Sequence, residues 1–314
     1  MNRNRKSGRR GLVLLLGSAV TLVATPAAEA VAAATTPSNN VPVKCASAKP
    51  AYAMLASQMA AKITQSLSTS QSTVGLSLAD DKTGVLCWYH SARHFYAASV
   101  VKVTILGALL RKAEEEHRYL TSTEVREARL MISQSNNDAA TALWNDVGLH
   151  FMQHFLNLAG MRQTKLSHAW GLTLITAHDE RLLLKLLSYK NSVLDDPSRS
   201  YALNLMAHVI TSQRWGVPAG APAIVTVHVK NGWLPYPGTT WEINSIGTFT
   251  TKTRTYMIAM LTYNNPTMAY GVATIENAAT VIHALLNPGE RASVPRSSPN
   301  PSWGIPDETI RGQR

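Results

Sequence analysis

The most constraining feature of this 314-residue sequence is the order in which its structural patterns change. Near the start, residues 73–78 and 85–90 alternate in hydrophobicity around a turn-forming stretch, which predicts a β-hairpin. Three more strand-like stretches rich in Thr, Ile, Val and Tyr come late in the chain, after a block of helical patterns. This order predicts an α+β protein in which a five-stranded sheet takes strands from both parts of the chain. The helical block would form an inserted all-helical lobe, with a cleft where the two lobes meet.

Helices are predicted wherever apolar side chains recur every three or four residues. In residues 51–69, for example, Leu55, Met59, Ile63 and Leu67 follow one another at steps of four. Similar patterns, together with capping residues, predict helices at 99–116, 121–133, 138–147, 150–159, 176–189, 197–209 and 269–286. The late strands are predicted at 223–230, 243–250 and 255–262, and residues 161–175 are predicted to be a loop.

The N-terminus has the three parts of a secretory signal peptide. Met1–Arg10 is basic, Leu12–Ala24 is apolar, and small residues at Ala28 and Ala30 suit a cleavage site. The apolar run is shorter than the roughly 20 residues of a membrane helix, so we predict secretion without stable membrane insertion. Cleavage is expected near Ala30, and the pair Arg9-Arg10 leaves open whether export follows the general or the twin-arginine route.

Composition divides the rest of the chain into three parts. Residues 31–50 are rich in Ala, Thr, Pro and Ser, which is typical of a flexible lead-in. Residues 51–287 carry the helix and strand patterns and form the predicted domain. Residues 288–314 are rich in proline and poor in apolar side chains, so we predict a frayed tail.

Composition also narrows the function classes. Hydrophobic residues make up 45% of the chain and charged residues 16%, which excludes a disordered or coiled-coil protein. The formal net charge of +11 suits anionic neighbours, but the basic residues are scattered and do not alternate with aromatic residues, so we expect no nucleic-acid partner. The ten histidines are dispersed and no zinc-binding spacing occurs, so we predict no metal and no other cofactor.

The two cysteines, Cys45 and Cys87, both lie in the part of the chain that would remain after export. An oxidising compartment allows such a pair to persist as a disulfide, which we predict here. The alternative is a pair of buried free thiols.

Three short motifs carry residues suited to nucleophilic catalysis. Ser99 and Lys102 lie one turn apart at the start of a predicted helix, where a lysine of lowered pKa can activate a serine and free amide groups can bind an oxyanion. Ser135-Asn136-Asn137 lies between two predicted helices, and Lys230-Asn231-Gly232 ends a predicted strand. Each motif alone also fits helix caps or a turn at the end of a strand.

Taken together and in this order, the three motifs resemble the signature of serine β-lactamases and penicillin-binding proteins. The stretches Arg93–Lys102, Met131–Ala140 and Thr176–Leu187 are similar to the corresponding segments of class A β-lactamases. The resemblance extends from about Tyr52 to Leu286. It implies the β-lactamase-like fold, with an antiparallel sheet flanked by helices.

The resemblance also implies roles for individual residues. Ser99 would be the acylated nucleophile, Lys102 its activating partner, and Ser135 the residue that passes a proton to the leaving nitrogen. Asn137 would hold the side-chain amide of the substrate, and Lys230 would face the substrate carboxylate.

Further contacts to the substrate are implied along the third motif. The backbone N–H groups of Ser99 and Trp233 would form the oxyanion hole. Gly232 would let the substrate backbone approach closely, and Asn231 would lie beside the substrate.

Several residues depart from the class A pattern. That class carries a glutamate in the omega loop that activates the deacylating water, whereas residues 164–173 contain no carboxylate, and His168 is the one alternative base in this stretch. Asn231 stands where the family has Thr or Ser, and no arginine occurs between Gly232 and Thr251. Aromatic residues occupy this rim instead and suit either a bulkier ligand or packing: Trp233, Tyr236 and Trp241.

These observations predict an exported serine hydrolase that forms an acyl-enzyme at Ser99 with a β-lactam or a related amide or peptide. One alternative is a penicillin-binding-protein-like peptidase that cleaves D-alanyl peptides. A second alternative is a non-catalytic protein that binds cell-wall fragments. The natural substrate and the oligomeric state are left open by the sequence.

Overall fold

A computed structural model describes residues 41–235 and 240–297 of the chain. The predicted signal peptide (1–30), the first part of the lead-in and the last part of the tail lie outside the described residues. So does Tyr236.

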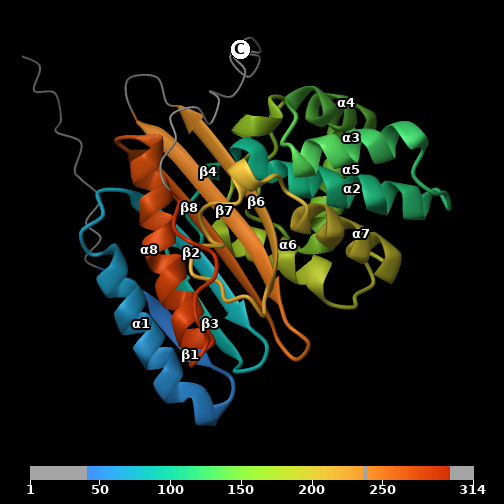
Figure 1. Cartoon of the computed structure of the whole chain (residues 1–314). Coiled ribbons are helices and arrows are strands. Elements are labelled where there is room, and N and C mark those ends of the chain that lie inside the picture. The colour runs from blue at the N-terminus through green and yellow to red at the C-terminus, as the bar shows by residue number, and fades with distance from the viewer. Residues whose placement is uncertain (1–40, 236–239, 298–314) are drawn as a thin grey trace, which may run out of the picture. The chain divides into compact units, whose positions relative to one another are not determined.

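A six-stranded antiparallel sheet takes strands from both parts of the chain (Figure 1). Its order is β1-β3-β2-β8-β7-β6, so the early hairpin pairs with the late strands between β2 and β8. The strands are β1 (Lys44–Ser47), β2 (Thr73–Asp80), β3 (Val85–Tyr89), β6 (Thr226–Pro235), β7 (Trp241–Thr250) and β8 (Thr255–Asn265). The predicted α+β class is therefore confirmed.

The predicted number of five strands was wrong, because β1 lies within the predicted lead-in. This strand has only four residues, too few to show an alternating pattern. It pairs with β3 in a register that places Cys45 opposite Cys87, and the two cysteines form a disulfide. The predicted disulfide is therefore confirmed, and it joins the lead-in to the edge of the sheet.

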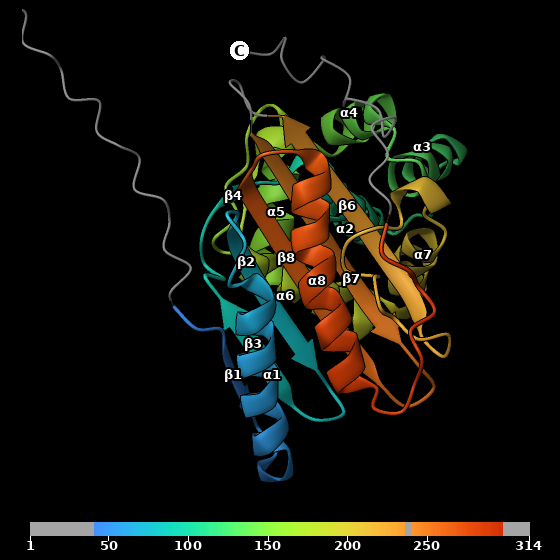
Figure 2. The same cartoon turned by 60° about the vertical axis from the view of Figure 1, so that its left-hand side comes forward.

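Helices cover both faces of the sheet. Helices α1 (Ala53–Leu67) and α8 (Met268–Leu286) lie on one face, and α6 (Ala177–Ser188) lies on the other (Figures 1 and 2). The central strand β8 is buried on both faces: Ile258 and Met260 belong to the core beneath α1 and α8, whereas Met257 and Leu261 belong to the core beneath the helical lobe. Because neighbouring residues of a strand point to opposite faces, one strand serves both cores.

The remaining helices form the inserted lobe, as predicted. They are α2 (Val101–Glu115), α3 (Ser122–Ser133), α4 (Asn137–Val147), α5 (Leu149–Ala159) and α7 (Asp196–Ala207). A capping box begins α3, because Thr121 accepts a hydrogen bond from the Glu124 amide and the Glu124 carboxylate accepts one from the Thr121 amide. Gly160 ends α5 with a φ of 71°, the left-handed conformation that glycine adopts without strain.

Two segments are more ordered than their sequence patterns indicate. The predicted loop 161–175 contains a 3-10 turn, η3 (Trp170–Leu172), and a short strand, β5 (Leu174–Ile175), which pairs with β4 (Phe95–Tyr96). The predicted tail is attached in its described part, since Ser297 donates a hydrogen bond to Glu276 at 2.7 Å. Both corrections have the same cause: single backbone or side-chain contacts leave no periodic signal.

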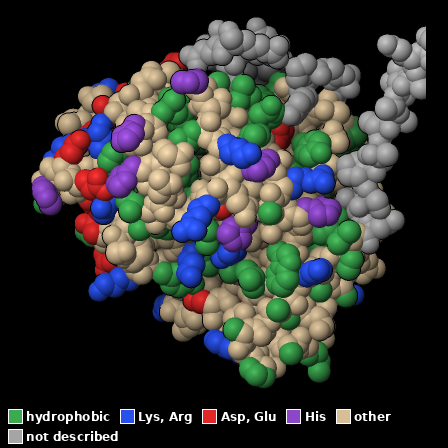
Figure 3. Space-filling model, turned by 180° about the vertical axis from the view of Figure 1, so that it is seen from behind, with side chains coloured by type: hydrophobic (Ala, Val, Ile, Leu, Met, Phe, Trp, Pro, Cys, Tyr) green, Lys and Arg blue, Asp and Glu red, His purple; other side chains and the backbone are tan. Residues whose placement is uncertain are grey.

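Basic side chains are spread over the face that Figure 3 shows. Lys, Arg and His side chains are interspersed with hydrophobic side chains on the far side of the molecule (Figure 3). Among the described helices, none combines the length and the hydrophobicity that a transmembrane span requires.

The disulfide gives the first testable prediction. It closes a loop between residues 42 positions apart, which the chain-entropy model values at about 4 kcal/mol. We expect the double variant Cys45→Ala/Cys87→Ala to lose about 2–4 kcal/mol of unfolding free energy in urea titrations. Wild-type protein reduced with dithiothreitol is the control and should approach the same value. A difference under about 0.5 kcal/mol would mean that the disulfide adds nothing to the stability of the protein.

Glu180 gives a second prediction. It is fully buried in α6, neither carboxylate oxygen has a hydrogen-bond partner among the described residues, and its neighbour Asp179 is acidic. Burial, followed by the charge of Asp179, raises the pKa of Glu180 well above its ordinary value. The folded protein thus holds a proton that the unfolded chain releases above about pH 4.5, so stability falls as pH rises.

The Glu180→Gln variant should lose this pH dependence. Above about pH 4.5 the wild type is expected to lose stability as pH rises, by up to about 1.4 kcal/mol per pH unit through this group until its raised pKa is reached, and the variant should lack this slope. Glu290→Gln changes an exposed glutamate and serves as the control. Parallel stability curves for the wild type and Glu180→Gln would contradict the prediction.

Candidate active site

The predicted nucleophile lies in a tight turn before a buried helix. Ser99 is half-buried in the 3-10 turn η2 (Ala98–Val100), which leads directly into α2. Backbone contacts on both sides fix the turn: the Ala97 amide donates to the Thr173 carbonyl at 2.8 Å, and the Asn244 side chain donates to the Tyr96 carbonyl at 2.8 Å. Ala98 has a φ of 47°, a strained conformation for a residue with a side chain.

Lys102 lies one turn further along and is completely buried. Its Nζ atom is 2.6 Å from the Ser135 carbonyl oxygen, 2.7 Å from Asn137 Oδ1 and 3.2 Å from Ser135 Oγ. The contacts come from the turn between α3 and α4, where Ser135 has a φ of 58°, and from Asn137, the first residue of α4. The first and second motifs of the sequence therefore meet at one amine.

Lys230, the first residue of the third motif, lies in the edge strand β6. It is completely buried, and its Nζ atom donates to Ser135 Oγ at 2.8 Å and to the Asn231 carbonyl at 3.0 Å. The Ser135 hydroxyl is thus shared by two lysines that are 128 positions apart in the sequence. We call Ser99, Lys102, Ser135 and Lys230 the lysine–serine cluster.

Burial determines the electrostatics of the lysine–serine cluster. It lowers the pKa of Lys230 to about 7. Burial, followed by the charge of Lys230, lowers the pKa of Lys102 well below its ordinary value. The hydrogen-bond partners of the two amines are neutral oxygens, so no carboxylate keeps either amine charged. Burial thus favours the uncharged form of a lysine beside a serine, and this form can accept a proton.

Gly232 allows β6 to pack directly against the turn that carries Ser99. A Cβ atom at this position would lie 2.9 Å from the backbone nitrogens of Ser99 and Val100 and 2.9 Å from the Ala97 carbonyl oxygen. No side chain fits there. The close approach brings the backbone of β6 next to the first amides of the nucleophile turn.

The other substrate-binding candidates lie in different surroundings. Asn137 contacts Lys102 through Oδ1. The buried Asn231 amide donates to the Gln213 and Trp215 carbonyls at 2.8 and 2.9 Å, so this side chain holds the segment after α7 against β6. Trp233 is half-buried, and its ring centroid is 5.8 Å from that of Trp215.

The loop opposite the nucleophile contributes an aromatic side chain that the sequence did not single out. The Lys102 Nζ atom lies 4.9 Å from the ring centroid of Trp170, and the indole Nε1 donates to Thr141 Oγ1 at 3.1 Å. His168, the alternative base, is exposed on the same loop. Asp179 binds the start of the loop through the backbone amides of Gln163 and Thr164, both at 2.8 Å.

Two positioning contacts had no usable signal in the sequence. Asn244 pairs with Gly232 across β6 and β7 and holds the strand before Ser99, but a single asparagine in a strand has no distinctive pattern. Trp170 lies in an irregular loop. Sequence periodicity cannot reveal either contact, because each depends on the folding of distant segments.

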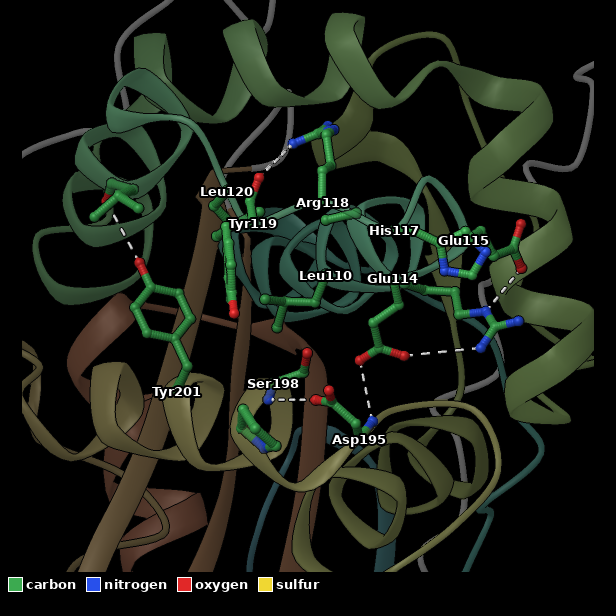
Figure 4. A pocket seen from close by; sticks show the side chains of 14 residues that line it. Leu110, Glu114, Glu115, His117, Arg118, Tyr119, Leu120, Asp195, Ser198 and Tyr201 are labelled. Carbon is green, nitrogen blue, oxygen red and sulfur yellow. Dashed lines mark hydrogen bonds and ion pairs between the residues drawn. The ribbon is translucent and has the colours of Figure 1, made fainter.

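A second hollow lies away from the lysine–serine cluster. A pocket of about 1030 Å³ opens between the last turns of α2, the start of α3 and the start of α7 (Figure 4). Its polar groups satisfy one another: Glu114 accepts from the Asp195 amide at 3.0 Å, and Asp195 accepts from the Ser198 amide at 2.8 Å. Because Lys102 and this pocket lie at opposite ends of α2, the pocket is separate from the cluster.

The antiparallel sheet, the inserted helical lobe and the lysine–serine cluster together define a β-lactamase-like protein. The sequence matches the model of the Beta-lactamase enzyme family over residues 58–129 and 125–286, and the chain therefore belongs to this serine hydrolase family. A search of curated proteins found no match.

Solved structures agree on the fold. A class A β-lactamase from Bacteroides cellulosilyticus is 18% identical, with a TM-score of 0.65, over 74% of this chain and 98% of that one. A β-lactamase from Sphaerobacter thermophilus is 20% identical, with a TM-score of 0.62, over 72% and 96%. A mutant of PBP-A, solved as an acyl-enzyme complex with penicillin G, is 18% identical, with a TM-score of 0.63, over 73% and 96%.

The close approach at Gly232 is testable. We expect Gly232→Ala to push β6 away from the Ser99 turn and to slow acylation by penicillin about 100-fold, because an error of about 1 Å in a reacting geometry has effects of this size. The measurement is the second-order rate of adduct formation by mass spectrometry. Gly247→Ala is the matched control, since its Cβ would also meet backbone at 2.9 Å, but at His228, away from Ser99. Equal losses of acylation in the two variants would contradict a local effect at the nucleophile turn.

Proposed function

We propose that this protein is an exported serine hydrolase that forms an acyl-enzyme at Ser99 with a β-lactam or a related amide or peptide. The observation that carries the proposal is the shared hydrogen bond of Lys102 and Lys230 to Ser135 beside the Ser99 turn. Two buried amines of lowered pKa are costly for a fold to maintain, and such groups concentrate at catalytic sites.

The residues suit each step of acyl transfer. Lys102, when uncharged, takes the proton of the Ser99 hydroxyl as Oγ attacks the substrate carbonyl carbon. The backbone N–H groups of Ser99 and Trp233 stabilise the oxyanion that forms. As the bond between carbon and nitrogen breaks, Ser135 donates its proton to the leaving nitrogen and recovers one from Lys102. Serine and substrate are then joined as an ester, and every proton is accounted for.

Residues in and beside the lysine–serine cluster bind the substrate. Lys230, in its charged form, attracts a substrate carboxylate, and Asn137 offers its amide hydrogens to a substrate carbonyl while its Oδ1 holds Lys102. Asn231 supports this wall indirectly, because its own amide hydrogens are occupied by the Gln213 and Trp215 carbonyls. The rings of Trp233 and Trp241 pack against the core beneath α1 and α8, which favours the packing alternative for them over contact with a substrate side chain.

A second candidate function is that of a penicillin-binding-protein-like D-alanyl peptidase. Residues 164–173 contain no carboxylate to activate a deacylating water, and Trp170 lies against Lys102 in this loop. Such a site favours a long-lived acyl-enzyme, and the similar structure of mutant PBP-A was solved as an acyl-enzyme with penicillin G. Export is supported by the pattern of residues 1–30 and by the disulfide, which persists best in an oxidising compartment.

The test is an intact-mass time course of residues 31–314 mixed with a penicillin. The wild type should gain the mass of one penicillin and the Ser99→Ala variant should gain none. An adduct that lasts for minutes or longer would favour the peptidase, and rapid turnover would favour a β-lactamase.

The decisive negative result is an unmodified wild type at millimolar penicillin. With D-alanyl peptides and simple esters also unreacted, it would overturn the acyl-enzyme proposal. The protein would then be a binding protein for cell-wall fragments, and ligands would raise its melting temperature without forming a covalent bond.

A further inference from the structure

Trp170 is held rigidly against the catalytic candidates. It is 7% exposed and belongs to the core beneath the helical lobe. Its indole nitrogen is hydrogen-bonded to Thr141 of α4, and the loop on either side is closed by two hydrogen bonds between Lys165 and Leu174. The nucleophile turn is joined to the same loop through Ala97 and Thr173. The ring therefore keeps a fixed place relative to Lys102.

The ring lies beside an amine whose other contacts are all polar. The Ser135 carbonyl and Asn137 Oδ1 can only accept hydrogen bonds, so an uncharged Lys102 donates its two N–H groups to them. Its lone pair is then left for a hydroxyl, either that of Ser135 or that of Ser99. An aromatic ring 4.9 Å away takes up space in which a water molecule would offer the amine another partner.

We propose that Trp170 is a positioning residue that keeps the Lys102 amine directed at Ser135 and Asn137 and excludes water from its remaining side. Besides lacking a carboxylate, the loop thus has a side chain with an active role in the space over Lys102.

The ring has two opposing effects on the charge of Lys102. The face of an indole attracts a cation, which favours the charged amine. Exclusion of water favours the uncharged amine. Burial, followed by the charge of Lys230, lowers the pKa of Lys102, so the exclusion of water prevails.

The consequence for the proposed reaction is a long-lived acyl-enzyme. Hydrolysis of the ester at Ser99 needs a water molecule close to both the ester carbonyl and a base. If Trp170 keeps water away from Lys102, the most available base cannot activate such a molecule. This part of the inference depends on the proposed function, whereas the effect on Lys102 does not.

The first experiment therefore needs no substrate. Titration of protein labelled with 13C at the lysine ε-carbon, with the signal assigned through Lys102→Arg, measures the midpoint of Lys102 by NMR. We expect Trp170→Ala to raise this midpoint by about one pH unit or more, because water reaches the amine. Trp170→Phe keeps a ring and should move it by less than half as much. Trp88→Ala removes a partly exposed tryptophan from β3 and is the matched control, which should leave the midpoint unchanged.

The second experiment measures how long penicillin stays attached. Release is followed by intact mass above the Lys102 midpoint of each variant, so that differences report access of water rather than charge. Trp170→Ala should release the adduct at least about tenfold faster than the wild type, and Trp170→Phe should release it at close to the wild-type rate.

The outcomes separate the two proposals. If the wild type reacts with neither penicillin nor D-alanyl peptides nor simple esters, the proposed function fails and the NMR titration alone decides the role of Trp170. If the Lys102 midpoint in folded Trp170→Ala equals that of the wild type, the inference is overturned whatever the adduct does. Thr141→Val removes only the hydroxyl that anchors the indole, and it provides a milder variant if Trp170→Ala does not fold.

Discussion

The structure depends on a hydroxyl group shared by two buried amines. Lys102 and Lys230 both lose their hydration, and a buried ammonium without compensation is unstable. Ser135 compensates both at once, but only if the start of α2, the turn before α4 and the edge strand β6 meet within hydrogen-bond distance. The helical lobe and the sheet must therefore pack in one fixed relation for either amine to be tolerated.

Several unusual local features satisfy this requirement. Ala98 and Ser135 both adopt positive φ values, and such strain persists only where the surroundings determine the conformation. Gly232 removes a side chain exactly where the strand must touch the nucleophile turn, and Asn244 holds that turn from the next strand. These features lie in different elements, yet each acts on the same small volume around Ser99.

Much of this could be predicted from the sequence. The change from alternating to helical periodicity gave the α+β class and the inserted lobe, because periodicity records which face of an element is buried. The ordered motifs identified Ser99, Lys102, Ser135 and Lys230, and the structure brings Lys102, Ser135 and Lys230 into contact beside the turn that carries Ser99. The first two motifs lie at the starts of helices, whereas the third lies within β6 and not at the end of a strand as predicted.

The features that could not be predicted depend on contacts between segments that are distant in the sequence. The four residues of β1 are too few for a pattern, and their pairing with β3 follows from folding. The position of Trp170 beside Lys102 also follows from folding. So does the hydrogen bond that the Asn231 amide donates to the segment after α7. The burial of Glu180 is even harder to predict from the sequence. A glutamate in an amphipathic helix usually faces water, and only packing determines that this one does not.

The strand order has a practical consequence for handling the protein. Strand β1 forms one edge of the sheet and β6, which carries Lys230, forms the other. With about 4.8 Å between neighbouring strands, the two edges lie roughly 24 Å apart. Because the disulfide anchors β1, a purification tag, fluorophore or surface linker placed just before residue 41 would be attached at the edge remote from Lys230. Immobilisation through that end should leave the lysine–serine cluster accessible.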